Sequence, residues 1–338
     1  MADLSLPLSV LDLGSVAGDA TSATALADTT RLAQAADRLG YHRFWVAEHH
    51  NMPIVASTAP AVLAAHLAAV TERIHVGSGG VMLPNHPPLV VAEQFAMLEA
   101  LHPGRIDLGI GRAPGTDPRT AAALRRGPDA LGAEEFPQHL IDLMGLVGDT
   151  RPGSQLHARF SATPRATTHP QVFLLGSSGY SAQLAGILGL AFVQAHHFDM
   201  GGTDESLRLY RQRFTSQGRL TEPYAIVSAN VVVAQTAEEA RSLSLPGRLV
   251  RFWLRTGRPI RLLSVEEAAG HPDLAAALAM PTEALIGSPE EVAEGLALLA
   301  ARTRANELMV TSTTAGYEEK VTSLDLLANA VGLAPQAA

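Results

Sequence analysis

The chain of 338 residues is 47% hydrophobic and 17% charged, which supports a large folded core and argues against disorder. Its 25 basic and 33 acidic residues give a net charge of −8 without any long run of Lys or Arg, so we expect no nucleic-acid partner. The absence of cysteine excludes disulfides, thiolate nucleophiles and iron–sulfur clusters, and the lack of a visible signal peptide or bilayer-length apolar stretch predicts a cytoplasmic protein without a membrane partner.

Short apolar or β-branched runs alternate with Ala- and Leu-rich segments along the chain. The runs that predict strands lie at residues 6–13, 43–47, from 74 onward, 105–110, 172–175, 191–195, 226–234 and 307–311. The segments that predict helices lie at residues 24–39, 60–70, 88–101, 121–146, 181–188, 206–215, 289–301 and 318–330. Gly and Pro interrupt the long helical region at residues 121–146. Strand followed by helix, eight times over, indicates a parallel sheet.

This alternation fits either a closed barrel or an open doubly wound sheet, and the glycines favour the barrel. The dinucleotide-binding fingerprint does not follow the first strand at Gly14–Gly18, and at Gly109–Gly115 its spacing is one residue too long. We therefore predict a single α/β domain over residues 1–338, a (β/α)8 TIM barrel with insertion helices at about residues 236–284, before the last βα unit.

Polar side chains follow the second predicted strand, and functional groups of a parallel barrel collect at such strand ends. Glu48 and His50 should share one face, with His49 on the other. His49 could exchange protons or bind a ligand; the alternative is a polar loop start with a buried, satisfied histidine. We expect no metal, because neither His49–His50 nor His196–His197 can place both imidazoles on one face of a strand.

Glycines interrupt the third predicted strand at Gly77, Gly79 and Gly80, after which apolar residues resume. They indicate a backbone bulge or a flat ligand lying against the strand, although a simple loop is the alternative. Arg112 follows the fourth strand and is a candidate phosphate ligand, since its fork matches phosphate oxygens. A structural ion pair would explain the same arginine.

A segment rich in Gly and Ser opens the helix after the fifth strand. Backbone N–H groups and hydroxyls at a helix start can bind an anion, whereas the alternative is an ordinary Ser-capped helix. The residues that predict this phosphate site are Gly176, Ser177, Ser178, Gly179, Tyr180 and Ser181.

Three segments resemble the luciferase-like flavin monooxygenases, a family that includes the α subunit of bacterial luciferase. The first is residues 44–50, the second begins at residues 76–84 and continues through Glu93 to residues 108–112, and the third is residues 175–180. Weaker similarity spans about residues 7–330. The likeness is greatest to single-chain members found beside antibiotic biosynthesis genes. The resemblance implies the (β/α)8 barrel, reduced FMN from a separate flavin reductase, and O₂ as co-substrate. A flavin C4a-hydroperoxide would then oxygenate a small organic substrate such as an aldehyde, ketone or polyketide.

The resemblance also implies roles for single residues. His49 matches the catalytic histidine beside flavin and substrate, and Arg112 matches the phosphate-binding arginine. Gly79–Gly80 falls on a non-prolyl cis peptide behind the isoalloxazine, and residues 177–181 complete the phosphate site. Gly111 stands where the luciferase α subunit has a cysteine, which argues against light emission but not against flavin binding.

Two other functions are compatible with the resemblance. Relatives on this barrel use the deazaflavin F420 for hydride transfer, which makes an F420-dependent dehydrogenase or reductase the first alternative. A flavin-binding protein without turnover is the second, and His49 together with the phosphate loop argues against it. The family pairs its barrels through helices of the early half, so we expect a homodimer in which Ala-rich residues 59–69 could contact the partner.

Overall fold

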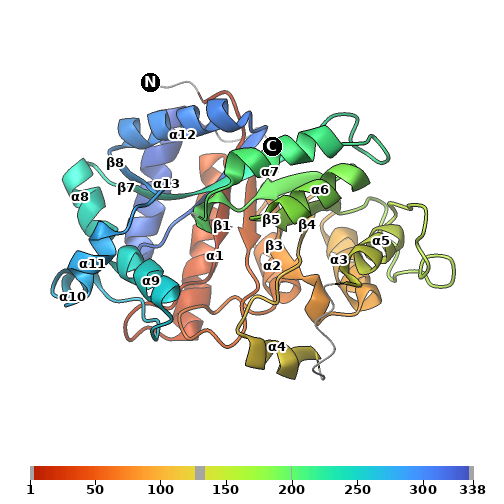
Figure 1. Cartoon of the computed structure of the whole chain (residues 1–338), viewed down its shortest axis with the longest axis horizontal. Coiled ribbons are helices and arrows are strands. Elements are labelled where there is room, and N and C mark those ends of the chain that lie inside the picture. The colour runs from red at the N-terminus through yellow and green to blue at the C-terminus, as the bar shows by residue number, and fades with distance from the viewer. Residues whose placement is uncertain (1–3, 126–133, 199, 335–338) are drawn as a thin grey trace.

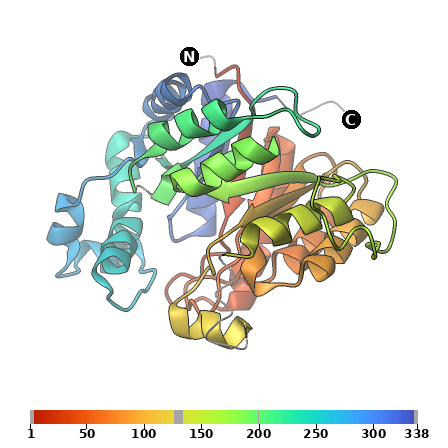
Figure 2. The same cartoon turned by 45° about the vertical axis from the view of Figure 1, so that its right-hand side comes forward.

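A closed ring of eight parallel strands, surrounded by helices, forms the centre of the molecule (Figures 1 and 2). The computed structural model describes residues 4–125, 134–198 and 200–334. Each barrel strand pairs with the next, and the pairs β6–β7, β7–β9 and β9–β1 close the ring. This closure confirms the predicted (β/α)8 TIM barrel. The barrel strands are β1 (Leu8–Asp12), β2 (Arg43–Val46), β3 (His75–Met82), β4 (Ile106–Gly111), β5 (Gln171–Gly176), β6 (Ala191–Gln194), β7 (Ala225–Val233) and β9 (Glu307–Thr311).

Helices coat the outside of this ring. Those that follow the barrel strands are α1 (Ser22–Leu39), α2 (Pro60–Ala69), α3 (Pro88–Leu101), α4 (Pro118–Arg125), α5 (Phe136–Leu146), α6 (Gly179–Leu188), α7 (Thr203–Arg213), α12 (Pro289–Thr303) and α13 (Tyr317–Val331). Four more helices, grouped beside the barrel at the left of Figure 1, lie within the region predicted to hold insertion helices. They are α8 (Ala237–Leu243), α9 (Leu245–Thr256), α10 (Val265–Ala269) and α11 (Leu274–Ala279).

One element differs from the sequence-based expectations. A short strand, β8 (Leu285–Gly287), pairs with the end of β7 outside the ring, and its three residues are too few to show a periodic pattern. The interrupted helical region predicted over residues 121–146 contains α4 and α5, and residues 126–133 between them lie outside the described part of the chain. None of the described helices is long and apolar enough to cross a membrane.

Side chains alternate between the barrel interior and the helical coat, because successive residues of a strand point to opposite faces. In β2, Phe44 and Val46 join the large core between strands and helices, whereas Trp45 points inward. There Trp45 meets Phe173 edge-on, with ring centroids 4.9 Å apart. The barrel centre is therefore a packed core rather than a pore. The other buried residues of this interior cluster are Leu11, Ala191, Val193, Ile226 and Met309.

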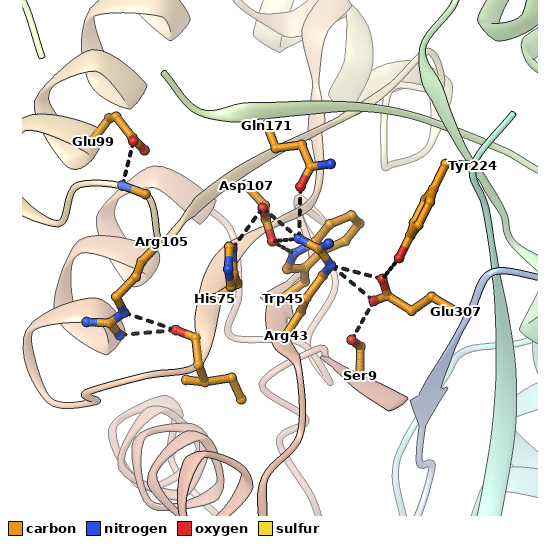
Figure 3. Close-up of polar contacts among 12 residues, drawn as sticks. Ser9, Arg43, Trp45, His75, Glu99, Arg105, Asp107, Gln171, Tyr224 and Glu307 are labelled. Carbon is orange, nitrogen blue, oxygen red and sulfur yellow. Dashed lines mark hydrogen bonds and ion pairs between the residues drawn. The ribbon is translucent and has the colours of Figure 1, made fainter. Parts of the chain in front are cut away.

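A buried charged network closes the amino end of the barrel (Figure 3). Arg43 is 4% exposed; its Nη1 donates to both oxygens of Asp107 at 2.8 and 2.9 Å, and its Nε donates to both oxygens of Glu307 at 3.1 Å. Trp45 Nε1 also donates to Asp107, and the Tyr224 hydroxyl donates to Glu307. Burial alone would lower the pKa of Arg43, but the charges of Asp107 and Glu307 raise it above its ordinary value.

Removing this guanidinium should destabilise the whole barrel. Arg43→Met leaves two buried carboxylates without their cation, which costs about 3–5 kcal/mol of unfolding free energy. The matched control is Arg208→Met, because Arg208 makes an exposed ion pair with Glu205 on α7 and its loss should change stability little. Urea unfolding followed by circular dichroism measures both variants. Equal unfolding midpoints for the two variants would contradict a structural role for the Arg43 network.

Candidate active site

The strand β3 is bulged where its carboxyl half passes β4. The pairing register shifts between Ser78 and Val81, and the peptide bond that joins Gly79 to Gly80 is cis, as the family resemblance implies. A Cβ on Gly80 would lie 2.7 Å from the carbonyl oxygen of Gly109 in β4. Close approach of the two backbones therefore requires glycine there, and the predicted bulge is confirmed, whereas the simple-loop alternative is wrong.

Arg112 comes directly after β4 and is partly buried. Its guanidinium carbon lies 4.3 Å from the centroid of the Tyr180 ring, so the structure brings together two of the predicted phosphate-site residues. Within residues 4–125, 134–198 and 200–334, no carboxylate forms an ion pair with Arg112. The alternative of a structural ion pair therefore has no support in the described chain.

The start of α6 faces this arginine with its backbone N–H groups uncapped by a side chain. Ser178 is the N-cap residue, yet its hydroxyl makes no capping bond, and the first turn carries no acidic residue. The alternative of an ordinary Ser-capped helix is therefore wrong. Ser181 is 3% exposed and packs against Gly176, where a Cβ would lie 2.4 Å from the Ser181 Cβ. Ser177 is partly buried beside it. Uncapped N–H groups at the positive end of a helix suit an anionic ligand.

His49 follows β2 and keeps its ring partly buried. Its Nδ1 is buried and makes no hydrogen bond within the described chain. Burial lowers the pKa of His49. The charge of Glu48 raises this pKa and that of His50 lowers it, so that the net value lies below the ordinary one. A neutral imidazole with an unused nitrogen can accept a proton or a hydrogen bond from a ligand.

The neighbouring residues have a structural task instead. Glu48 is fully buried, and its Oε1 lies 2.9 Å from Nε2 of both His50 and His86. Burial would raise the pKa of Glu48, but His86, His50 and the N–H of Met82 hold it below its usual range. His50 is partly buried and hydrogen-bonded, so the alternative of a satisfied histidine applies to it and not to His49. Sequence reasoning missed His86, because nothing local links it to Glu48.

A second polar group lies across the barrel mouth from His49. His196 and His197 belong to the 3₁₀ helix η2 (His196–Phe198) rather than to the end of β6, so the strand geometry expected for them is wrong. His197 Nδ1 lies 2.6 Å from the hydroxyl of Ser228 in β7. Burial lowers the pKa of His197 to about 4, with smaller contributions from His49 and His196. His49 follows β2 and the 3₁₀ helix follows β6, four strands away in the ring, so the two histidines lie on opposite sides of the carboxyl end of the barrel. No group of three or more His, Asp or Glu suited to a metal occurs in the described chain.

The insertion helices approach this end of the barrel. Leu262, after α9, accepts a hydrogen bond from Gly18 N at 2.7 Å, and Arg255 donates to the carbonyl of Phe198 at 3.2 Å. Gly247 in α9 packs against Thr313, where a Cβ would lie 2.1 Å from the hydroxyl. These contacts join the insertion to the loops that follow β1, β6 and β9.

The family model described as luciferase-like monooxygenase matches residues 6–307. A luciferase-like monooxygenase from Escherichia coli (strain K12) is 38% identical over 330 residues, 96% of this chain and 97% of that protein. An N-acetyl-S-alkylcysteine monooxygenase from Bacillus subtilis (strain 168) is 36% identical over 337 residues, 96% and 98% of the two chains. The crystal structure of apo-MsnO8 superposes with a TM-score of 0.88 at 36% identity, covering 98% of this chain and 100% of that one. The chain belongs to the luciferase-like monooxygenase family.

Proposed function

We propose that this protein is an FMN-dependent monooxygenase that uses reduced FMN and O₂ to oxygenate a small organic substrate. One observation carries the proposal: Arg112, without a carboxylate partner in the described chain, stands beside the uncapped start of α6 at the same barrel mouth as His49. The positive charge and N–H groups suit a phosphate, and the nearby neutral imidazole suits proton transfer.

The residues present fit FMN. Arg112 and residues 177–181 would hold its phosphate, and the Gly79–Gly80 bulge would support its flat ring system. When bound, reduced FMN supplies the electrons with which O₂ is split, so that one oxygen atom enters the substrate and the other leaves as water. The chain itself binds and orients the reactants and limits access of water, while His49 takes up or gives a proton at its ring.

Names of relatives support the cofactor and a partner. The oxygenase component of the flavin-dependent trigonelline monooxygenase of Acinetobacter baylyi (strain ATCC 33305 / BD413 / ADP1) is 26% identical over 322 residues, 89% of this chain and 87% of that protein. An oxygenase component implies a separate reductase, so we expect reduced FMN from a flavin reductase in solution. A coenzyme F420-dependent tetrahydromethanopterin reductase from Methanopyrus kandleri shares the fold at 14% identity and a TM-score of 0.67, covering 96% and 98% of the two chains. Titration with each cofactor decides between them, and binding of F420 without binding of FMN would contradict the proposal.

The substrate class is tested with a panel of three oxidisable groups. The family resemblance suggests an aldehyde or a ketone, for which decanal and cyclohexanone are probes. The Bacillus subtilis relative is named for N-acetyl-S-alkylcysteines, so N-acetyl-S-methylcysteine adds a thioether. Product formation that requires both reduced FMN and O₂ supports the proposed function, and FMN binding without oxidation of any probe contradicts it.

Replacing Arg112 should mainly weaken FMN binding, whereas replacing His49 should mainly slow oxygenation of the substrate. Charge-assisted hydrogen bonds contribute roughly 1.5–3 kcal/mol, so Arg112→Ala should weaken FMN binding about ten- to a hundredfold. His49→Ala should keep near-normal FMN affinity and lose about a hundredfold or more in substrate oxygenation, because a positioned proton-transfer group is missing. Fluorescence titration and single-turnover oxidation measure the two effects, with the exposed Arg208→Ala and His157→Ala as controls. Unchanged FMN affinity in Arg112→Ala would remove that residue from the site.

The pH profile of the wild type should reflect the lowered pKa of His49. A group whose pKa is lowered stays neutral until the pH falls below its ordinary value of about 6.5. We expect kcat/KM to stay level from pH 7.5 to 6.5 and to decline below that range as His49 is protonated. Steady-state oxygen uptake measures the profile, and NMR of the histidine rings assigns it. A His49 titration midpoint above pH 6.5 would show that the ring is not in the predicted environment.

We propose that the protein forms a homodimer through α2 and α3. These helices contact each other and expose large apolar side chains: Val62 is 70% exposed, Met97 53% and Leu101 64%. Val90, Met97 and Leu101 lie along one stripe of α3, at i, i+7 and i+11. A second copy of this chain would cover that stripe, in agreement with the pairing that the family resemblance implies.

A charge in this stripe should break the dimer. Leu101→Glu places a carboxylate in the proposed interface and should give a monomer by light scattering at micromolar concentration. Leu298→Glu on α12 is the matched control, since Leu298 has the same exposed fraction, 64%, and should leave the mass unchanged. A wild type that is already monomeric, or a dimer that Leu101→Glu leaves intact, would refute the proposed interface.

A further inference from the structure

The hydrogen bonds around Ser228 determine which nitrogen of His197 carries its hydrogen. The Ser228 hydroxyl donates to the carbonyl oxygen of Gln194 at 3.1 Å, and a carbonyl can only accept. The single hydroxyl hydrogen is thereby used, so the 2.6 Å contact between Ser228 Oγ and His197 Nδ1 requires Nδ1–H as the donor. Nε2 of the neutral ring is then an acceptor, and within the described chain no residue hydrogen-bonds to it.

Asn230 provides a second unused acceptor beside it. Its Nδ2 donates to the carbonyl oxygen of His197 at 3.1 Å, which fixes the orientation of the amide. Asn230 Oδ1 is buried and makes no hydrogen bond within the described chain. A buried acceptor without a partner costs free energy, and this cost is recovered when a ligand donates a hydrogen bond.

Both acceptors stand opposite the strand bulge. In the ring of eight strands β7 is four strands away from β3, and β6 is four strands away from β2. A flat ring that lies against Gly79–Gly80 in β3 therefore turns its other face toward Ser228 and Asn230 in β7. His197 follows β6, and His49 follows β2 on the opposite side of the ring. A substrate that binds at the carboxyl end of the barrel is therefore expected between these two sides.

We propose that His197 is a substrate-binding residue, whose Nε2 accepts a hydrogen bond, together with Asn230 Oδ1, from an N–H or O–H group of the organic substrate. This inference rests on the proposed monooxygenase function and deepens it. The substrates it predicts are amides, amines, alcohols or phenols that carry the donor near the oxidised atom. A compound without such a donor leaves both acceptors unpaired and should be discriminated against.

The experiment compares two probes in the wild type and in His197→Asn. The probes are N-acetyl-S-methylcysteine and the same compound with a methyl group on its acetamide nitrogen, so that the second probe lacks the N–H donor. Decanal is a third compound that has no donor. In His197→Asn the side-chain amide can still donate to Ser228, as Nδ1–H does, but nothing remains at the position of Nε2. His197→Gln is the conservative variant, because its longer side chain returns a carbonyl oxygen near that position.

The expected result is a KM about tenfold higher for the N-methylated probe in the wild type, a smaller KM difference in His197→Asn, where Asn230 Oδ1 is the acceptor that remains, and partial recovery of the difference in His197→Gln. Affinity for reduced FMN should be the same in all three proteins. NMR of ¹⁵N-labelled histidine in the full chain should show the His197 hydrogen on Nδ1. This measurement needs no substrate.

Four results would overturn the inference. They are a wild type that does not distinguish the two probes, discrimination that is undiminished in His197→Asn, oxidation of decanal but not of the N–H probe, and a hydrogen found on Nε2. Weaker FMN binding in His197→Asn, with unchanged discrimination, would assign the donor to the flavin rather than to the substrate. If the wild type oxidises none of the probes, the proposed monooxygenase function itself has failed. The proposed role of His197 in substrate binding then fails with it.

Discussion

The barrel depends on the buried ion pairs that the Arg43 guanidinium makes with Asp107 and Glu307. It joins the amino ends of three strands, β2, β4 and β9, through paired bonds to Asp107 and Glu307. Buried carboxylates at such a position are tolerated only with a cation and further donors, which Trp45 and Tyr224 supply. With this end closed and the centre filled by aromatic and aliphatic side chains, ligands can approach only from the carboxyl end of the strands.

The same packing determines the shape of the functional face. Gly79 points toward Leu11 and Trp45, whose side chains would lie within 2.7 to 3.3 Å of an added Cβ, and Gly80 lies against the backbone of β4. The bulge is thus a consequence of a filled interior next to a closely packed strand pair. It leaves a surface of backbone atoms where a flat ring can lie, and Arg112, the start of α6, His49 and His197 follow other strands at the same end of the barrel.

Much of this arrangement could be predicted from the sequence, and the exceptions have physical reasons. Strand ends that carry Glu48-His49-His50, Arg112 or the Gly-Ser segment stand out because polar residues interrupt apolar runs. Ser228 and Asn230 do not stand out, since they lie within the apolar run of β7 and only the closed ring shows that they point inward. The partners of Arg43 are 64 and 264 residues away, beyond the reach of any local pattern. The tautomer inferred for His197 depends on the hydrogen bond from Ser228 in β7 to Gln194 in β6, which no local sequence pattern predicts.

We propose that the barrel mouth binds FMN with its phosphate between Arg112 and the start of α6 and its ring against Gly79–Gly80. A crystal structure of the protein soaked with FMN tests it most directly. The account predicts phosphate oxygens within hydrogen-bonding distance of the Arg112 guanidinium and of the backbone N–H groups at residues 179–181, with the ring stacked on the bulge of β3 and its open face toward His197. A phosphate bound instead at the loops after β7 and β9, the usual position in this type of barrel, would contradict the account.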